Sequence, residues 1–131
     1  MNRKGFTLME LTIVLAILAI IAAILIPSLL LTSDRARLRG DIQSARVIQN
    51  AMELYHIERG VSPGNNIESI INRLQETDYL SEGEMQTQTN GGKWVFSQEN
   101  GVQLDISGCS DSVKRAYESL PDNEKAFVVG S

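Results

Sequence analysis

The chain begins with Met1-Asn2-Arg3-Lys4-Gly5-Phe6-Thr7-Leu8-Met9-Glu10-Leu11 and continues into an apolar run that ends at Leu31. At 1.5 Å per residue, a helix over residues 11–31 is about 30 Å long, which matches the hydrocarbon core of a bilayer. Between Gly5 and Ser33 the only charged residue is Glu10. This stretch therefore predicts a membrane-spanning helix with a short basic head and one carboxylate near its start.

Glu10 needs an explanation, because a carboxylate in the middle of a membrane helix costs about 2.5–3.5 kcal/mol, and somewhat less near the helix end. A cut after Gly5 would create an α-amino group on Phe6, four residues before Glu10. That amine could pair with Glu10 within one helix or between neighbouring helices. A buried ion pair of this kind fixes the register of packed helices more than it adds stability.

Two simpler interpretations of the first segment compete with this one. A secretory signal peptide has a shorter apolar region followed by a small-x-small cleavage site. Here the apolar run is longer, and residues 28–36 contain no convincing site of that kind. A plain single-pass anchor fits the length but leaves Glu10 unexplained.

Charge alone gives a conflicting orientation for the span. Arg3 and Lys4 precede it, but Arg35, Arg37 and Arg39 follow it closely. The positive-inside rule would then put the C-terminal side in the cytoplasm.

The stretch from Lys4 to Leu11 closely resembles the prepilin motif of type IV pilins and pseudopilins. The resemblance implies that a membrane-embedded aspartyl peptidase cleaves between Gly5 and Phe6 on the cytoplasmic face. It also implies that the amine of Phe6 is methylated and that Glu10 sets the register of assembly. The family keeps its N-terminus in the cytoplasm, which settles the orientation conflict in favour of an external C-terminal part.

The family's proline within this helix matches Pro27, which is expected to remove one backbone hydrogen bond and kink the helix. Many members carry a glycine about eight residues before that proline, but this chain has Ala19 there. Local melting of the helix between these two positions during assembly is therefore left open.

Beyond Pro27 the apolar residues narrow to a single helical stripe, which we expect to dock a sheet. Its members are Leu38, Ile42, Ala45, Ile48, Met52 and Tyr55. The other faces are expected to be polar, and they carry Asp34, Arg35, Arg37, Arg39, Asp41, Gln43, Arg46, Gln49, Asn50 and Glu53. The pattern predicts one helix from about Phe6 to Glu58.

The distal part begins with the turn-forming residues 60–66. A short helix capped by Asn65 or Asn66 should follow, then a long loop over residues 77–92. Alternating residues predict strands over 93–98 and 102–106, joined by a turn at Glu99-Asn100-Gly101. A further helix near 113–120 and a third strand at 126–129 complete an α+β fold, in which a long helix packs on a small antiparallel sheet.

These elements define four regions: a cleaved leader (residues 1–5), a membrane and filament-core helix (6–31), an amphipathic stem (32–59) and a distal globular domain (60–131). From Gly60 onward there are five basic and eleven acidic residues, which argues against a nucleic-acid-binding surface on that domain.

Composition also limits the chemistry of the chain. The single cysteine, Cys109, excludes an internal disulfide, and with one histidine, His56, a Cys/His zinc site is excluded too. Residues Asp122-Asn123-Glu124 form an acidic turn whose oxygen atoms suit calcium, but an ordinary turn has the same composition. No phosphate loop or nucleophile elbow is present. We therefore expect neither an enzyme nor a cofactor or metal, with calcium at the acidic turn left open.

The sequence thus predicts a structural subunit of a type IV pilus-like filament that serves adhesion, motility or DNA uptake. A type II secretion pseudopilin is the alternative, and a monomeric membrane-anchored binding module is a distant third. The implied partners are other filament subunits, a prepilin peptidase, an inner-membrane assembly platform and membrane lipid. The implied location is the cytoplasmic or inner membrane, followed by an extracellular or periplasmic filament.

Overall fold

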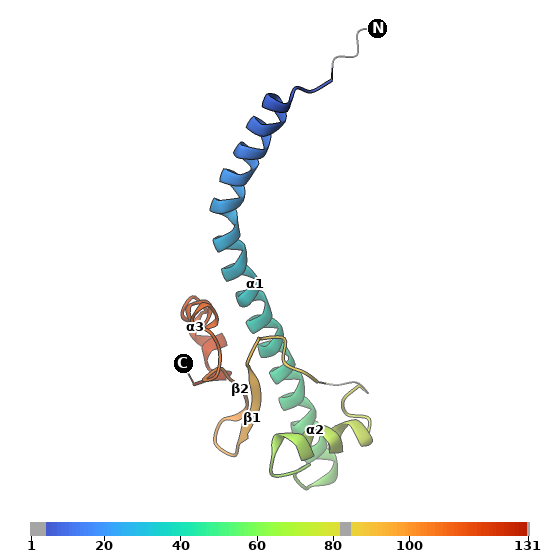
Figure 1. Cartoon of the computed structure of the whole chain (residues 1–131). Helices are drawn as coiled ribbons and strands as arrows, with labels where there is room; N and C mark the ends of the chain where they lie inside the picture. Colours follow the sequence, from blue (N-terminus) through green and yellow to red (C-terminus); the bar gives the residue numbers. More distant parts are fainter. Residues whose placement is uncertain (1–4, 82–84, 131) are drawn as a thin grey trace.

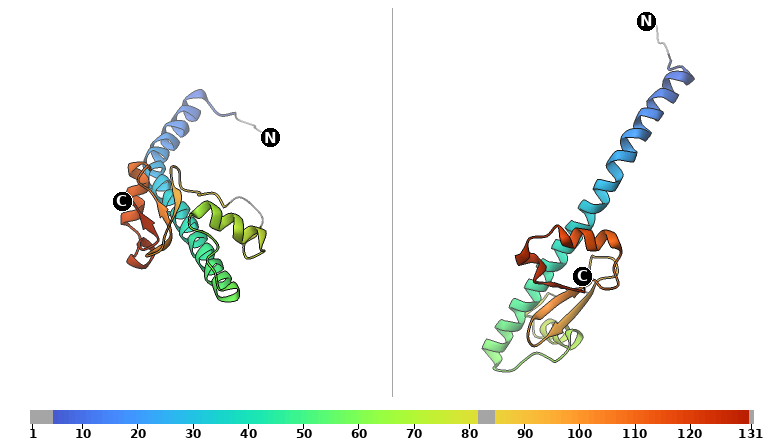
Figure 2. Two further views of the ribbon diagram at one scale, coloured as in Figure 1. Left: turned by 90° about the horizontal axis from the view of Figure 1, so that it is seen from below. Right: turned by 90° about the vertical axis from the view of Figure 1, so that its left-hand side faces the viewer.

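The computed structural model describes residues 5–81 and 85–130. One long helix, α1 (Leu8–Arg59), runs the length of the molecule, and every other element packs against its second half. The first half projects alone, so the molecule is a stalk with a small domain at one end (Figures 1 and 2).

The ends of α1 follow from local chemistry. Thr7 has an extended backbone and caps the N-terminus with its side chain. Gly60 ends the helix with φ of 71°, a left-handed conformation that suits glycine because it lacks a Cβ atom. These bounds confirm the predicted single helix to within about two residues at its start and one at its end.

Pro27 lies inside α1, and the helix continues through it. Figure 1 shows α1 as a continuous, gently curved helix. Proline removes one donor from the helical ladder and favours bending at its position. A localised kink at Pro27 remains a prediction.

Helix α2 (Ile67–Glu76) lies across the distal end of α1. Of the two predicted caps the structure selects Asn66, whose side chain accepts a hydrogen bond from the Ser69 N–H at 2.8 Å. Ile70 and Leu74 are buried on one face of α2, as helical spacing predicts.

The sheet has three strands in the order β1 (Lys93–Ser97), β2 (Gly101–Asp105) and β3 (Val128–Val129). β1 and β2 are antiparallel, but β3 runs parallel to β2. The expectation of a wholly antiparallel sheet was wrong at this strand.

The reason lies in the connection between β2 and β3, which contains α3 (Asp111–Glu118) and the short helix α4 (Asp122–Lys125). A helical crossover carries the chain back to the end where it started, so the next strand enters parallel. The helix predicted near residues 113–120 is part of this crossover, so its presence between the two strands already indicated a parallel third strand.

The hairpin between β1 and β2 has a three-residue loop, because Ser97 pairs with Gly101 across the ladder. Gly101 has φ of 73°, the left-handed residue that such loops need at their end. The predicted Asn-Gly turn is thus present, with Gly101 already counted as the first residue of β2.

The core is made of two buried clusters along α1. The first joins Leu38 and Ile42 to β2, β3 and α3, and the second joins the stem from Ala45 to Tyr55 to α2, Leu80 and Val102. All six residues of the predicted apolar stripe are buried. The prediction that this stripe docks a sheet is confirmed.

Asp41 departs from the predicted polar face, since it is only 1% exposed. Its two carboxylate oxygens accept hydrogen bonds from the backbone N–H groups of Gln88 (2.7 Å) and Thr89 (2.8 Å). Asp41 therefore attaches the loop before β1 to the stem helix. A buried carboxylate is tolerated when backbone donors satisfy it in this way.

Candidate functional site

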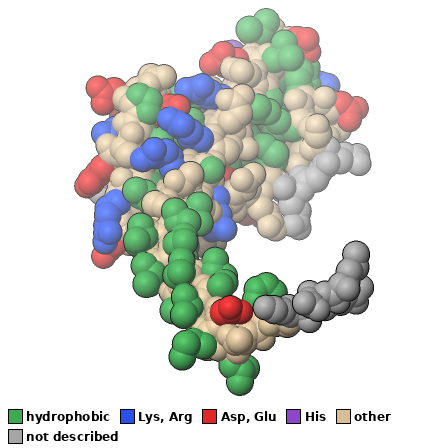
Figure 3. Space-filling view, turned by 90° about the horizontal axis from the view of Figure 1, so that it is seen from above, with side chains coloured by type: hydrophobic (Ala, Val, Ile, Leu, Met, Phe, Trp, Pro, Cys, Tyr) green, Lys and Arg blue, Asp and Glu red, His purple; other side chains and the backbone are tan. Residues whose placement is uncertain are grey.

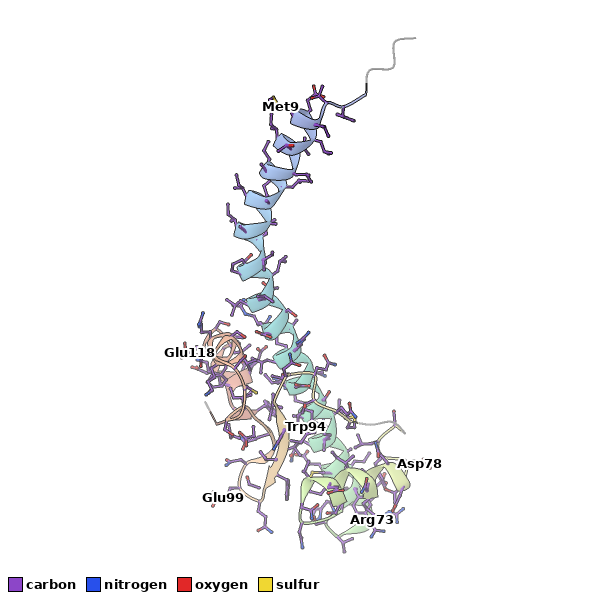
Figure 4. The ribbon with its side chains drawn as sticks, viewed as in Figure 1. Met9, Arg73, Asp78, Trp94, Glu99 and Glu118 are labelled. Atoms are coloured by element: carbon purple, nitrogen blue, oxygen red, sulfur yellow. The ribbon has the colours of Figure 1, made fainter. Side chains whose placement is uncertain are left out.

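From Leu8 to Leu30, the first half of α1 has no partner within the described residues. Its apolar side chains are exposed throughout this stretch: Leu8 is 85% exposed and Ile24 is 71% exposed. The 18-residue window that is apolar enough to cross a membrane has none of its residues buried. Figure 4 shows side chains projecting from this half in all directions, with Met9 labelled near its end. An apolar surface this large indicates contact with lipid or with other proteins.

The start of this helix is organised by Thr7 and Glu10. The Glu10 N–H donates to the Thr7 hydroxyl at 3.2 Å, and the Thr7 N–H donates to the Glu10 carboxylate at 3.2 Å. This reciprocal arrangement is a capping box, which satisfies two N–H groups that the first turn of a helix leaves unpaired.

Sequence reasoning missed this role for Glu10. The signal was present as Thr7-Leu8-Met9-Glu10, which fits the S/T-x-x-E pattern of a capping box. Before any cleavage the carboxylate therefore has one donor, the Thr7 N–H, even without a cationic partner. It also lies in the first turn, where a negative charge is stabilised by the helix dipole.

The predicted cleavage point lies just before this capping box. Gly5 and Phe6 are both exposed, and among the described residues none beyond its chain neighbours comes within 4 Å of the position that a Cβ atom would occupy on Gly5. A cut between them would place a free amine on Phe6, the residue before the N-cap. Arg3 and Lys4 of the predicted leader lie outside the described residues.

The stem arginines lie where α1 enters the distal domain. Arg35 donates to Ser119 at 2.9 Å, Arg39 pairs with Glu124 at 3.1 Å, and Arg46 lies over the ring of Phe127 at 5.0 Å. In Figure 3, which looks down from the N-terminal end, basic and acidic side chains are interspersed around the apolar helix. These arginines attach the C-terminal segments to the stem.

The other residues considered as sites have structural roles. Cys109 is buried, and desolvation raises the pKa of its thiol. Among the described residues no group of three or more His, Cys, Asp or Glu side chains could hold a metal ion. At the acidic turn, Glu124 is engaged by Arg39.

Fold and site together define a stalked protein with a bare apolar helix and a capped, accessible N-terminal junction. Comparison with known proteins agrees with this class. The family model of the prokaryotic N-terminal methylation motif matches residues 1–26.

Relatives extend the match beyond the motif. The chain is 33% identical to a fimbrial protein of Neisseria meningitidis over 123 residues, covering 90% of the chain and 65% of that protein. It is 40% identical over 79 residues to a type IV wide pilus major component of Thermus thermophilus, covering 58% of each. It is 25% identical over 72 residues to the type II secretion system core protein G of Escherichia coli, covering 53% of the chain and 50% of that protein. No solved structure shows significant similarity.

These matches support assignment of the chain to the type IV pilin and type II secretion pseudopilin family. The chain spans about two thirds or less of the length of these relatives. The relatives are named as components of pili and secretion systems, in agreement with the expectation that the chain is not an enzyme.

Proposed function

We propose that the chain is a prepilin that is cut between Gly5 and Phe6, methylated on the Phe6 amine and assembled into a pilus-like filament. The first half of α1 anchors it in the inner membrane before assembly and forms the filament core afterwards. Packing of that half against other copies replaces its contact with lipid, and heterologous packing of this kind produces an open helical filament.

The observation that carries this proposal is the bare apolar half of α1 joined to a methylation-type N-terminus. A membrane anchor alone needs the apolar surface but not the sequence from Lys4 to Glu10. The fimbrial protein and the wide pilus component named above favour a pilus.

A secretion pseudopilin remains the alternative, because the chain also resembles type II secretion core protein G. The two candidates share the N-terminal region, so the motif does not separate them. Imaging of the cell surface does: long filaments containing this chain favour a pilus, and their absence in cells that require the chain for protein export favours a pseudopilin.

Processing is tested with Gly5→Ala, which should leave the leader attached because the peptidase no longer accepts the junction. Intact mass spectrometry of the membrane-extracted chain measures the result. A variant that still starts at methylated Phe6 would contradict the peptidase assignment.

Assembly is tested with two variants that separate the charge of Glu10 from its capping role. Glu10→Gln keeps an acceptor for the Thr7 N–H but removes the charge, whereas Thr7→Ala removes the hydroxyl cap and keeps the charge. If Glu10 pairs with the Phe6 amine of another copy, Glu10→Gln should reduce filament yield strongly and Thr7→Ala only mildly. Equal yields for Glu10→Gln and the unmodified chain would refute the pairing.

A further inference from the structure

Thr7 marks the point at which the chain changes from extended backbone to helix. Its φ and ψ are −74° and 156°, and α1 begins at the next residue. The predicted cleavage bond, between Gly5 and Phe6, lies in the extended part, with only Phe6 between it and this N-cap. Figure 4 shows this end of α1 projecting away from the distal domain. The conformation of the junction is therefore set by its own residues.

The carbonyl group of Gly5, at which a peptidase would act, is free. Among the described residues no backbone N–H donates to it. The first backbone hydrogen bond of the helix is made instead by Thr7, whose carbonyl oxygen accepts from the Leu11 N–H at 3.1 Å. Enzymes and other proteins commonly bind peptides as extended strands that offer their backbone groups. The start of α1 at Leu8 thus leaves the bond in a conformation that can be cut.

An earlier start of the helix would change this. Glycine is about as good an N-cap as threonine, so a helix that began at Phe6 could be capped by Gly5. The carbonyl oxygen of an N-cap accepts the first hydrogen bond of its helix, which here would come from the Met9 N–H. The carbonyl group of the cleavage bond would then be part of the helix.

The capping box disfavours this earlier start. The Glu10 N–H donates to the Thr7 hydroxyl, and the Thr7 N–H donates to the Glu10 carboxylate, both at 3.2 Å. Both hydrogen bonds need Thr7 in the extended conformation of an N-cap, because a helical Thr7 would direct its side chain and N–H elsewhere. A chain that lost them would place the start of the helix less firmly at Leu8.

We propose that Thr7 is a positioning residue for cleavage, because its cap holds the start of α1 at Leu8 and keeps the Gly5 carbonyl group out of the helix. The inference rests on the proposed function, in which a peptidase hydrolyses this bond. Hydrolysis breaks the C–N bond. Water supplies the second oxygen of the Gly5 carboxylate and gives its two protons to the Phe6 amine, which becomes an ammonium group. Thr7 acts on this step only through the start of the helix.

Initial cleavage rates test the inference, with the full chain in detergent micelles and the prepilin peptidase of the same organism. Thr7→Val keeps the shape of the side chain but removes the hydroxyl, and it should lower kcat/KM about 2- to 30-fold, the factor that corresponds to loss of an N-cap. Thr7→Asn introduces a different side chain that also caps well, and it should retain most of the rate. Initial rates are needed because a slowed chain is still cleaved completely at long times.

Thr12 provides the matched control. It lies in the same apolar helix, but its hydroxyl donates to the Leu8 carbonyl oxygen at 2.7 Å and caps no N–H group. Thr12→Val should therefore be cleaved at the unmodified rate. Equal slowing by Thr12→Val would assign the effect to the added apolar surface, and slowing by Thr7→Asn to the level of Thr7→Val would mean that the peptidase recognises threonine itself. Either result would overturn the inference.

Backbone chemical shifts of Phe6 in micelles supply a second measurement. They should move toward helical values in Thr7→Val and stay at extended values in Thr7→Asn, since only the first variant loses the cap. Slow cleavage of Thr7→Val with Phe6 still fully extended would also overturn the inference, because the helix start would not have moved.

The outcomes separate this inference from the proposed function. Cleavage of Thr7→Val at the unmodified rate would overturn the inference and leave the processing assignment intact. Failure of the peptidase to cleave the unmodified chain would overturn the proposed function itself.

Discussion

The two halves of α1 differ in what covers their apolar side chains. From Leu38 to Tyr55 the helix buries one apolar stripe against a sheet and two helices of its own chain. From Leu8 to Leu30 it buries nothing within the described residues, although it is the more apolar half. The second half is therefore stabilised within the monomer, and the first half is left for lipid or other proteins to cover.

Leu38 and Leu18 provide the sharpest test of this contrast. Leu38→Ala should destabilise the distal domain by about 2–5 kcal/mol, because Leu38 is fully buried and its truncation leaves a cavity. Leu18→Ala should leave the unfolding midpoint unchanged, since Leu18 is exposed and lies in the stretch of α1 that packs against no other described element. Denaturant unfolding in detergent micelles, followed by Trp94 fluorescence, measures both. Equal effects at the two positions would break the comparison.

The Asp41 contact should have the next largest effect. Asp41→Ala leaves the N–H groups of Gln88 and Thr89 without their acceptor, at about 1–3 kcal/mol for each unsatisfied group. Asp41→Asn keeps one carbonyl oxygen and should cost less. Hydrogen exchange at the two amides reports the loss directly. Unchanged protection in the alanine variant would show that the loop is held by other contacts.

Removal of the capping box tests what stabilises the first turn in the bare half of α1. Thr7→Ala should destabilise its first turn by about 0.5–2 kcal/mol, because one N–H loses its side-chain acceptor. Faster amide exchange confined to residues 8–11 is expected in micelles. No change there would mean that the surrounding detergent, rather than the cap, holds the helix start.

The smallest effect concerns pH. The backbone N–H of Ser107 donates to Asp105 at 2.9 Å and lowers the pKa of that carboxyl below its usual value. A carboxyl group whose pKa is lower in the folded state than in the unfolded state stabilises the fold at pH values above its unfolded-state pKa. This contribution to stability is lost as the pH falls through the folded-state pKa. Asp105→Asn should therefore slightly flatten the fall in unfolding midpoint between neutral pH and about pH 2. An unchanged acid profile would assign that fall to other carboxyl groups.

Much of the fold follows from the sequence because its periodicity is strong. The stripe from Leu38 to Tyr55 predicts both the stem helix and the face that it buries. The role of Asp41 was hidden, because its partners are backbone groups 47 and 48 residues away, and a pattern reports side chains and not distant amides. The direction of β3 was missed because a run of two paired residues carries no directional signal of its own.

At the N-terminal site, too, some features follow from the sequence and others only from the hydrogen bonds in the structure. The sequence from Lys4 to Leu11 carries the resemblance to the family and predicts a cationic partner and a register-setting role for Glu10, but its capping role is not part of that prediction. Its hydrogen bonds with Thr7 give the carboxylate a local role that precedes any assembly. A capping pattern at the start of an apolar helix is easily overlooked when the acid has a more conspicuous interpretation.

The central claim is that the bare half of α1 is covered by other copies in the filament. Ile24→Cys and Glu99→Cys, each made with Cys109→Ser, place one thiol on the bare half and one on the exposed hairpin loop. Purified filaments free of lipid are treated with a water-soluble maleimide and the labelled fraction is measured by intact mass. The account predicts rapid labelling at position 99, and protection at position 24 that is lost when detergent dissolves the filament. Equal labelling at both positions in intact filaments would contradict it.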